Sequence, residues 1–168
     1  ACKKVVSKSI IYYPKTVKLT RTGLVYSGKV QKPRVVIRDA KNKIISSSLY
    51  TLKYSAGCKN VGRYTVRVTF KGNYSGAVSL YYQILPKGTV ISAATSRSGG
   101  FTVRWKKQAT QTSGYQIQYA ENSSFRGART ITISKNSTTV RNILKLKKNK
   151  KYLTNATKIR CKKDAFAD

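Results

Sequence analysis

Two segments of alternating apolar and polar residues, joined by a short turn, constrain the fold of this chain more than any other feature. Residues 64–70 read Tyr-Thr-Val-Arg-Val-Thr-Phe, and residues 78–84 read Val-Ser-Leu-Tyr-Tyr-Gln-Ile. Successive side chains of a β-strand point to opposite faces of a sheet, so this alternation predicts two strands. The glycines and asparagine of 71–76 predict a turn between them. The segment 85–88, Leu-Pro-Lys-Gly, predicts a joint between two small β domains.

The second half shows the same pattern of strands and turns. Three apolar side chains share one face in each of the segments 101–105 and 115–119, and the segments 130–134 and 138–143 follow. Strands that recur about every ten residues are typical of a β-sandwich. No segment keeps the period of about 3.6 residues that a helix requires. We therefore expect an all-β protein of two antiparallel β-sandwich modules in tandem, over residues 1–86 and 87–168.

The charge of the chain is strongly one-sided. It has 35 Lys and Arg against four Asp and Glu, for a net charge of +31. Such a charge attracts anionic polymers, namely cell-wall polymer, sulfated glycan or nucleic acid, with weak selectivity and strong dependence on salt. The alternative is that the lysines serve solubility and protect exposed strand edges.

The side chains that usually carry catalysis are scarce. The chain has no His, which is the commonest general base, and it lacks a Cys-x-x-Cys motif. We therefore expect no enzyme, no cofactor, and no catalytic, cofactor-binding or metal residues. The three cysteines, Cys2, Cys58 and Cys161, leave at least one thiol without an intrachain partner, and a bridge between Cys2 and Cys58 stays open. No apolar run approaches the roughly 20 residues of a membrane-crossing helix.

Two groups of side chains are candidates for binding. The first is a basic turn that would hold anions, with the alternative that it is only solvated: Lys145, Lys147, Lys148, Lys150 and Lys151. The second is a set of tyrosines that would stack on sugars or bases if exposed: Tyr12, Tyr13, Tyr81 and Tyr82. The alternative for the tyrosines is core and cross-strand packing.

The second half resembles a fibronectin type III domain. Trp105 matches the buried Trp of the second strand, and Tyr119 matches the aromatic residue of the third. The segment 144–152 matches the Leu, turn and Tyr of a tyrosine corner, in which the Tyr152 hydroxyl bonds to backbone near 144–147. The resemblance implies a core that contains Trp105, Tyr115, Ile117, Tyr119, Leu144 and Tyr152.

The first half resembles the small Ig-like, MBG-like β modules of secreted Firmicutes surface proteins, as in gut Clostridia. The matching residues are Tyr26-Ser-Gly28, Pro33, Tyr50 to Tyr54, Asn60-Val-Gly62 and Gly72 to Gly76. This resemblance implies a secreted or cell-surface, extracellular location. From about residue 153 the chain departs from the fibronectin pattern and stops where the last strand should begin. We therefore expect a C-terminally truncated sandwich with an open edge, through which two copies could associate.

These observations favour a non-enzymatic extracellular binding or adhesion module of a bacterial surface or secreted protein, in contact with host proteins or glycans. One alternative is a structural spacer that its charge holds at the anionic cell wall. Another is a secreted fibronectin type III fragment that acts as the ligand of a host receptor. The sequence identifies neither the ligand nor the receptor.

Overall fold

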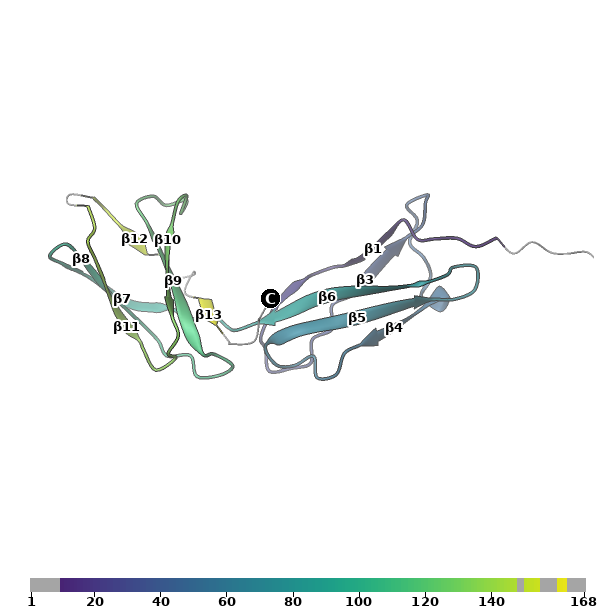
Figure 1. The fold of residues 1–168 in the computed structure, drawn as a ribbon, viewed down its shortest axis with the longest axis horizontal. Helices are drawn as coiled ribbons and strands as arrows, with labels where there is room; N and C mark the ends of the chain where they lie inside the picture. The colour runs from purple at the N-terminus through teal and green to yellow at the C-terminus, as the bar shows by residue number, and fades with distance from the viewer. Residues whose placement is uncertain (1–9, 148–149, 155–159, 163–168) are drawn as a thin grey trace, which may run out of the picture. The chain divides into compact units, whose positions relative to one another are not determined.

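The computed structural model describes residues 10–147, 150–154 and 160–162, and its regular structure is almost entirely β-strand (Figure 1). The short helical segment η1 (Ser47–Leu49) is a 3-10 turn. The described residues form two compact units. The first comprises residues up to Ile84, apart from the segment Val25–Ser27, and the second comprises that segment and the residues from Leu85 onward. The prediction of an all-β protein with almost no helix is therefore confirmed.

The first unit contains a four-stranded and a two-stranded sheet. The larger sheet has the order β2-β6-β5-β4, and the smaller one pairs β1 with β3. The strands are β1 (Thr16–Leu19), β2 (Gly23–Val25), β3 (Val35–Arg38), β4 (Tyr50–Tyr54), β5 (Gly62–Phe70) and β6 (Ala77–Leu85). β5 is antiparallel to both β4 and β6, so the two alternating segments form the predicted hairpin.

Alternation along β5 places one face of the larger sheet in the core of this unit. Val66, Val68 and Phe70 are buried, whereas the polar residues between them are exposed. Val68 and Phe70 pack with Ile37 of β3 and with Ile45. The apolar face of the larger sheet therefore packs on the smaller sheet, as in a β-sandwich.

Tyr82 is buried, so of the two roles left open by the sequence, the structure shows core packing for this residue and not a place on an exposed stacking platform. Its hydroxyl donates a hydrogen bond to the carbonyl oxygen of Gln31 at 2.9 Å. Tyr82 lies two residues before the buried Ile84 and therefore shares its face of β6. Tyr81 points to the other face and is exposed, but the guanidinium of Arg63 lies 4.6 Å from the centre of its ring.

The second unit is a sandwich of two sheets, which Figure 1 shows as two layers. One sheet has the order β11-β8-β7, and the other has the order β10-β9-β12, with β13 also on β9. The strands are β7 (Ile91–Arg97), β8 (Gly100–Trp105), β9 (Gly114–Ala120), β10 (Arg129–Ile133), β11 (Val140–Leu144), β12 (Leu153–Thr154) and β13 (Arg160–Lys162). All of the pairs within these two sheets are antiparallel. The predicted fibronectin type III-like sandwich is thereby confirmed as a fold.

The core of the second unit lies between its two sheets. Its buried side chains come from both layers: Phe101, Val103, Trp105 and Ile143 from one, and Tyr115, Ile117, Tyr119 and Ile133 from the other. Tyr152 is only partly buried and packs against this core. Leu144 was expected in the core, but half of its surface is exposed. Its neighbour Ile143 faces inward, so Leu144 must face outward, and Leu146 packs against the core instead.

The edge strand beside β9 consists of two short segments. Leu153 and Thr154 pair with Ala120 and Tyr119, and Arg160–Lys162 pairs with residues 116–114. Five residues separate the two segments, whereas two separate their partners on β9. The prediction that the chain departs from the fibronectin pattern from about residue 153 concerns this strand and stays a prediction. Residues 155–159 and 163–168, on which the predicted open edge also depends, lie outside the described residues.

Cys58 is a free thiol in the interior of the first unit. The side chain is 1% exposed, and its Sγ donates a hydrogen bond to the carbonyl oxygen of Ser55 at 3.0 Å. Burial, together with interactions with Cys58, raises the pKa of the neighbouring Tyr82 well above its usual range. Cys2, the other half of the bridge left open by the sequence, lies outside the described residues.

Candidate functional site

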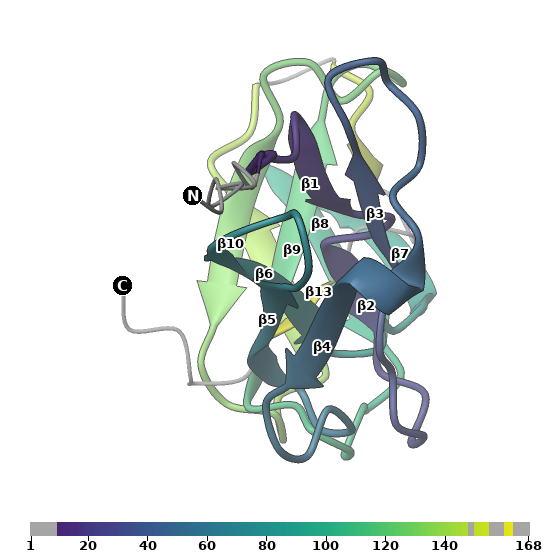
Figure 2. The same ribbon diagram turned by 90° about the vertical axis from the view of Figure 1, so that its right-hand side faces the viewer.

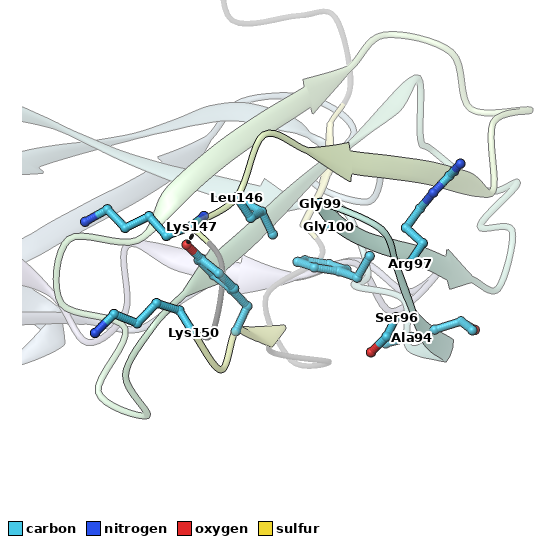
Figure 3. Close-up of a pocket in the computed structure, with 11 residues that line it drawn as sticks. Ala94, Ser96, Arg97, Gly99, Gly100, Leu146, Lys147 and Lys150 are labelled. Atoms are coloured by element: carbon cyan, nitrogen blue, oxygen red, sulfur yellow. Dashed lines mark hydrogen bonds between the residues drawn. The ribbon is translucent and has the colours of Figure 1, made fainter.

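A cavity of about 460 Å³ lies at one end of the second unit, between the β7–β8 hairpin and the turn that follows β11 (Figure 3). Its basic side chains are Arg97, Lys147 and Lys150. Its apolar lining includes Phe101 and Leu146. The cavity thus combines a hydrophobic floor with three cations from segments that are distant in the sequence.

Tyr152 fixes the turn that carries the two lysines. The backbone N–H of Lys147 donates to the Tyr152 hydroxyl oxygen at 3.1 Å, which confirms the predicted tyrosine corner. The Tyr152 hydroxyl donates in turn to a carboxylate oxygen of Glu121 at 3.2 Å. Its ring packs against Tyr119, with the ring centroids 6.4 Å apart. These contacts hold Tyr152 half-buried against the core, to which the sequence assigned it.

The other wall of the cavity depends on close backbone approach between strands. A Cβ atom at Gly100 would collide with the carbonyl group of Ile143 on β11, so this position requires glycine. Gly99 has a φ of 68°, in the left-handed region that glycine adopts without strain, and it closes the β7–β8 hairpin. The backbone N–H of Leu146 donates to the Gly99 carbonyl oxygen at 3.1 Å. The hairpin and the lysine turn are therefore bonded to each other.

The three cations do not converge on one point. Figure 3 shows Lys147 and Lys150 extending to the same side, whereas Arg97 extends to the other side. All three side chains are exposed. Separate charges on either side of an apolar floor suit several anionic groups along an extended chain better than one small anion, which needs donors directed at a single position.

The predicted basic turn contributes only part of this site. Lys147 and Lys150 line the cavity, whereas Lys145 and Lys151 are exposed and do not line it. Lys148 lies outside the described residues. No local sequence pattern marks Arg97 as part of this site, because its place at the cavity depends on the register of β7 against β8.

The described residues show neither a candidate metal site nor a candidate membrane-crossing helix. They contain no group of three or more His, Cys, Asp or Glu side chains placed to hold a metal ion. Within the same residues, no helix has the length and apolar character to cross a membrane.

Comparison with solved structures finds a similarity to a fibronectin tandem. The crystal structure of chicken CNTN1 FN1-FN3 domains aligns with 91% of this chain at 15% sequence identity and a TM-score of 0.39. The chain spans 66% of the length of that structure. No family model matches the sequence, and no curated protein matches it.

Proposed function

We propose that this chain is a non-enzymatic extracellular binding module of a bacterial surface or secreted protein, and that it holds an anionic polymer at the cavity of the second unit. The supporting observation is the placement of Arg97, Lys147 and Lys150 around an apolar floor. The polymer would carry repeated sulfate or phosphate groups, as sulfated glycans and cell-wall polymers do. The net charge of +31 would steer such a polymer toward the protein from a distance.

The number of cations sets the expected dependence on salt. Each anionic group that the protein neutralises releases counterions. A plot of the logarithm of the binding constant against the logarithm of the salt concentration therefore falls with a slope of about 0.7–0.9 per group. Three cations would then account for about 2–3 of the total slope. The remaining slope would come from the other basic residues. The cavity and the diffuse charge can therefore be separated by measurement.

A triple variant, Arg97→Ser with Lys147→Ser and Lys150→Ser, tests the proposal. The matched control replaces Lys106, Lys107 and Lys135 with Ser. Both variants lower the net charge by three, from +31 to +28. Lys106 and Lys107 follow the far end of β8, and because a strand rises about 3.3 Å per residue, they lie roughly 17 Å from the cavity, beyond the Debye length at physiological salt.

Binding to heparin and to inorganic polyphosphate would be measured between about 50 mM and 200 mM salt, where such interactions weaken steeply. We expect the slope of the binding constant against salt, on logarithmic axes, to be shallower by about 2 in the cavity variant. In the control variant it should change by less than about 1. Equal weakening in both variants would favour the spacer held by diffuse charge. Absence of binding by the unmodified chain at low salt would contradict the proposal.

A further inference from the structure

A second cavity, of about 360 Å³, lies at one end of the first unit and has a different chemistry. It forms where the N-terminal segment, the turn after β3 and the β5–β6 turn meet. Figure 2 views this end of the unit, with the β5–β6 turn toward the reader. The residues that matter for its chemistry are Tyr12, Tyr13, Asp39, Lys41, Asn73 and Tyr74. Its volume lies within the range of small-molecule sites.

Two of the aromatic rings are held in place by backbone and core contacts. The backbone N–H of Tyr12 donates to the Asn73 carbonyl oxygen at 2.7 Å, in a parallel bridge between Tyr12 and Tyr74. The two rings lie 5.9 Å apart at 42°. The ring of Tyr74 also packs against the ring of the buried Phe70, and the two ring centroids are 6.4 Å apart. The rings therefore form a preorganised surface.

Asp39 supplies a fixed acceptor beside these rings. It begins the turn after β3, and its Oδ1 accepts a hydrogen bond from the backbone N–H of Lys43 at 2.8 Å. Asn42 closes this turn with a φ of 64°, and its N–H donates to the Asp39 carbonyl oxygen at 3.0 Å. One carboxylate oxygen is thus tied to the turn, which sets the direction of the other.

The tyrosines at this cavity remain accessible. Tyr12 is 49% exposed and Tyr13 is 73% exposed, whereas Tyr82 and Tyr115 are fully buried. Large aromatic side chains that are exposed in a cluster mark a binding surface more often than large aromatic side chains that are exposed singly. The predicted stacking role for Tyr12 and Tyr13 therefore has a cavity in which it can operate.

We infer that this cavity binds a neutral hexopyranose. The face of such a ring presents C–H groups, which suit the negative face of a tyrosine ring, and its hydroxyl groups can donate to Asp39 and bond to the Asn73 amide. The Asp39 carboxylate disfavours an anion. Lys41 beside the cavity and the net charge of +31 disfavour a cation. An uncharged ring with apolar faces and polar edges meets all of these conditions.

The test uses cellotetraose and tetra-N-acetylchitotetraose, which are uncharged, with the whole chain labelled for ¹H–¹⁵N spectra. We expect amide shifts confined to residues 10–13, 39–43 and 71–76, with a Kd in the low millimolar range, about −4 kcal/mol. Tyr13→Ala should weaken binding at least about fivefold, as loss of one stacking ring does for bases. Asp39→Asn, which keeps the shape of the side chain, should weaken it about tenfold through the lost charge-assisted bond.

Tyr81→Ala is the matched control, because Tyr81 is also an exposed tyrosine of the first unit but does not line the cavity. It should leave the Kd within a factor of about two, the usual range for a surface change away from a site. The Kd should also be unchanged by salt, unlike polyanion binding. Absence of shifts up to about 20 mM of either sugar, which means a binding free energy weaker than about −2.3 kcal/mol, would overturn the inference. Shifts caused by decaproline and by neither sugar would overturn it in favour of a peptide groove.

Discussion

The substitution Tyr115→Phe removes one buried hydroxyl from the second unit and leaves its packing intact. Tyr115 is fully buried. Its hydroxyl donates to the Asn136 carbonyl oxygen at 2.9 Å and accepts from the backbone N–H of Gln108 at 3.0 Å. These two bonds join the segments that follow β8 and β10. Phenylalanine keeps the ring, which meets Trp105 edge-on at a centroid distance of 5.4 Å.

The magnitude follows from the two lost hydrogen bonds. A hydrogen bond contributes about 0.5–1.5 kcal/mol net, and a partner left buried and unsatisfied costs about 1–3 kcal/mol. Gln108 and Asn136 are partly exposed, so water can reach their backbone groups and the lower values apply. We expect a loss of about 2 kcal/mol in the free energy of unfolding. For a domain of this size, that lowers Tm by roughly 8–16 °C.

Trp105 makes the measurement specific to the second unit. It is the only Trp of the chain and is 3% exposed in that unit's core, so its fluorescence reports the unfolding of that unit in urea. The control is Tyr64→Phe in the first unit, which removes one exposed bond to the Asn60 carbonyl oxygen and should leave the Trp105 transition unchanged. A loss below about 0.5 kcal/mol for Tyr115→Phe, with an unchanged m-value, would refute the reasoning.

Three further predictions concern single positions. Gly114→Ala should lower the free energy of unfolding by more than about 2 kcal/mol, because the new Cβ would collide with the carbonyl of Ile133. Gly127→Ala is strained only by the positive φ at that position and should lower it by about 1 kcal/mol. Urea titration of both variants compares the two losses. The first unit should lose stability as pH rises above about 10, the pKa of an unfolded tyrosine, because the pKa of Tyr82 is raised in the folded state. The Tyr82→Phe variant should lose less stability over the same pH range when denaturation is measured at high pH. Cys58 should react with a thiol reagent only after unfolding, as peptide mass mapping would show.

Alternation predicted strands such as β5 and β8 well, because each of these two is buried on one face only. The same rule would have placed Tyr82 inside, since Leu80, Tyr82 and Ile84 are spaced by two along β6. It would also have placed Leu144 outside once Ile143 was assigned to the core. The error at Leu144 came from treating adjacent apolar residues as equivalent, although neighbours on a strand face opposite ways.

The candidate sites were predictable only where their residues are neighbours in the sequence. Lys147 and Lys150 belong to one turn, and Tyr12 and Tyr13 to one segment, so both pairs could be identified. Arg97 comes to the same cavity as the lysines through strand pairing, which no local pattern specifies. Asp39 joins the tyrosines in the same way, through contacts between segments that are distant along the chain.

The two glycines that meet a carbonyl group, Gly100 and Gly114, give this sandwich a recognisable sequence signature. Each is the first residue of its strand and precedes an aromatic, an aliphatic and a second aromatic residue on alternate positions. The strings Gly-Phe-Thr-Val-Arg-Trp and Gly-Tyr-Gln-Ile-Gln-Tyr therefore share one pattern, set by backbone approach at the first position and core packing at the others. A search for two such strings about 14 residues apart should find sequences able to build the same pair of layers, even where overall identity is too low for alignment.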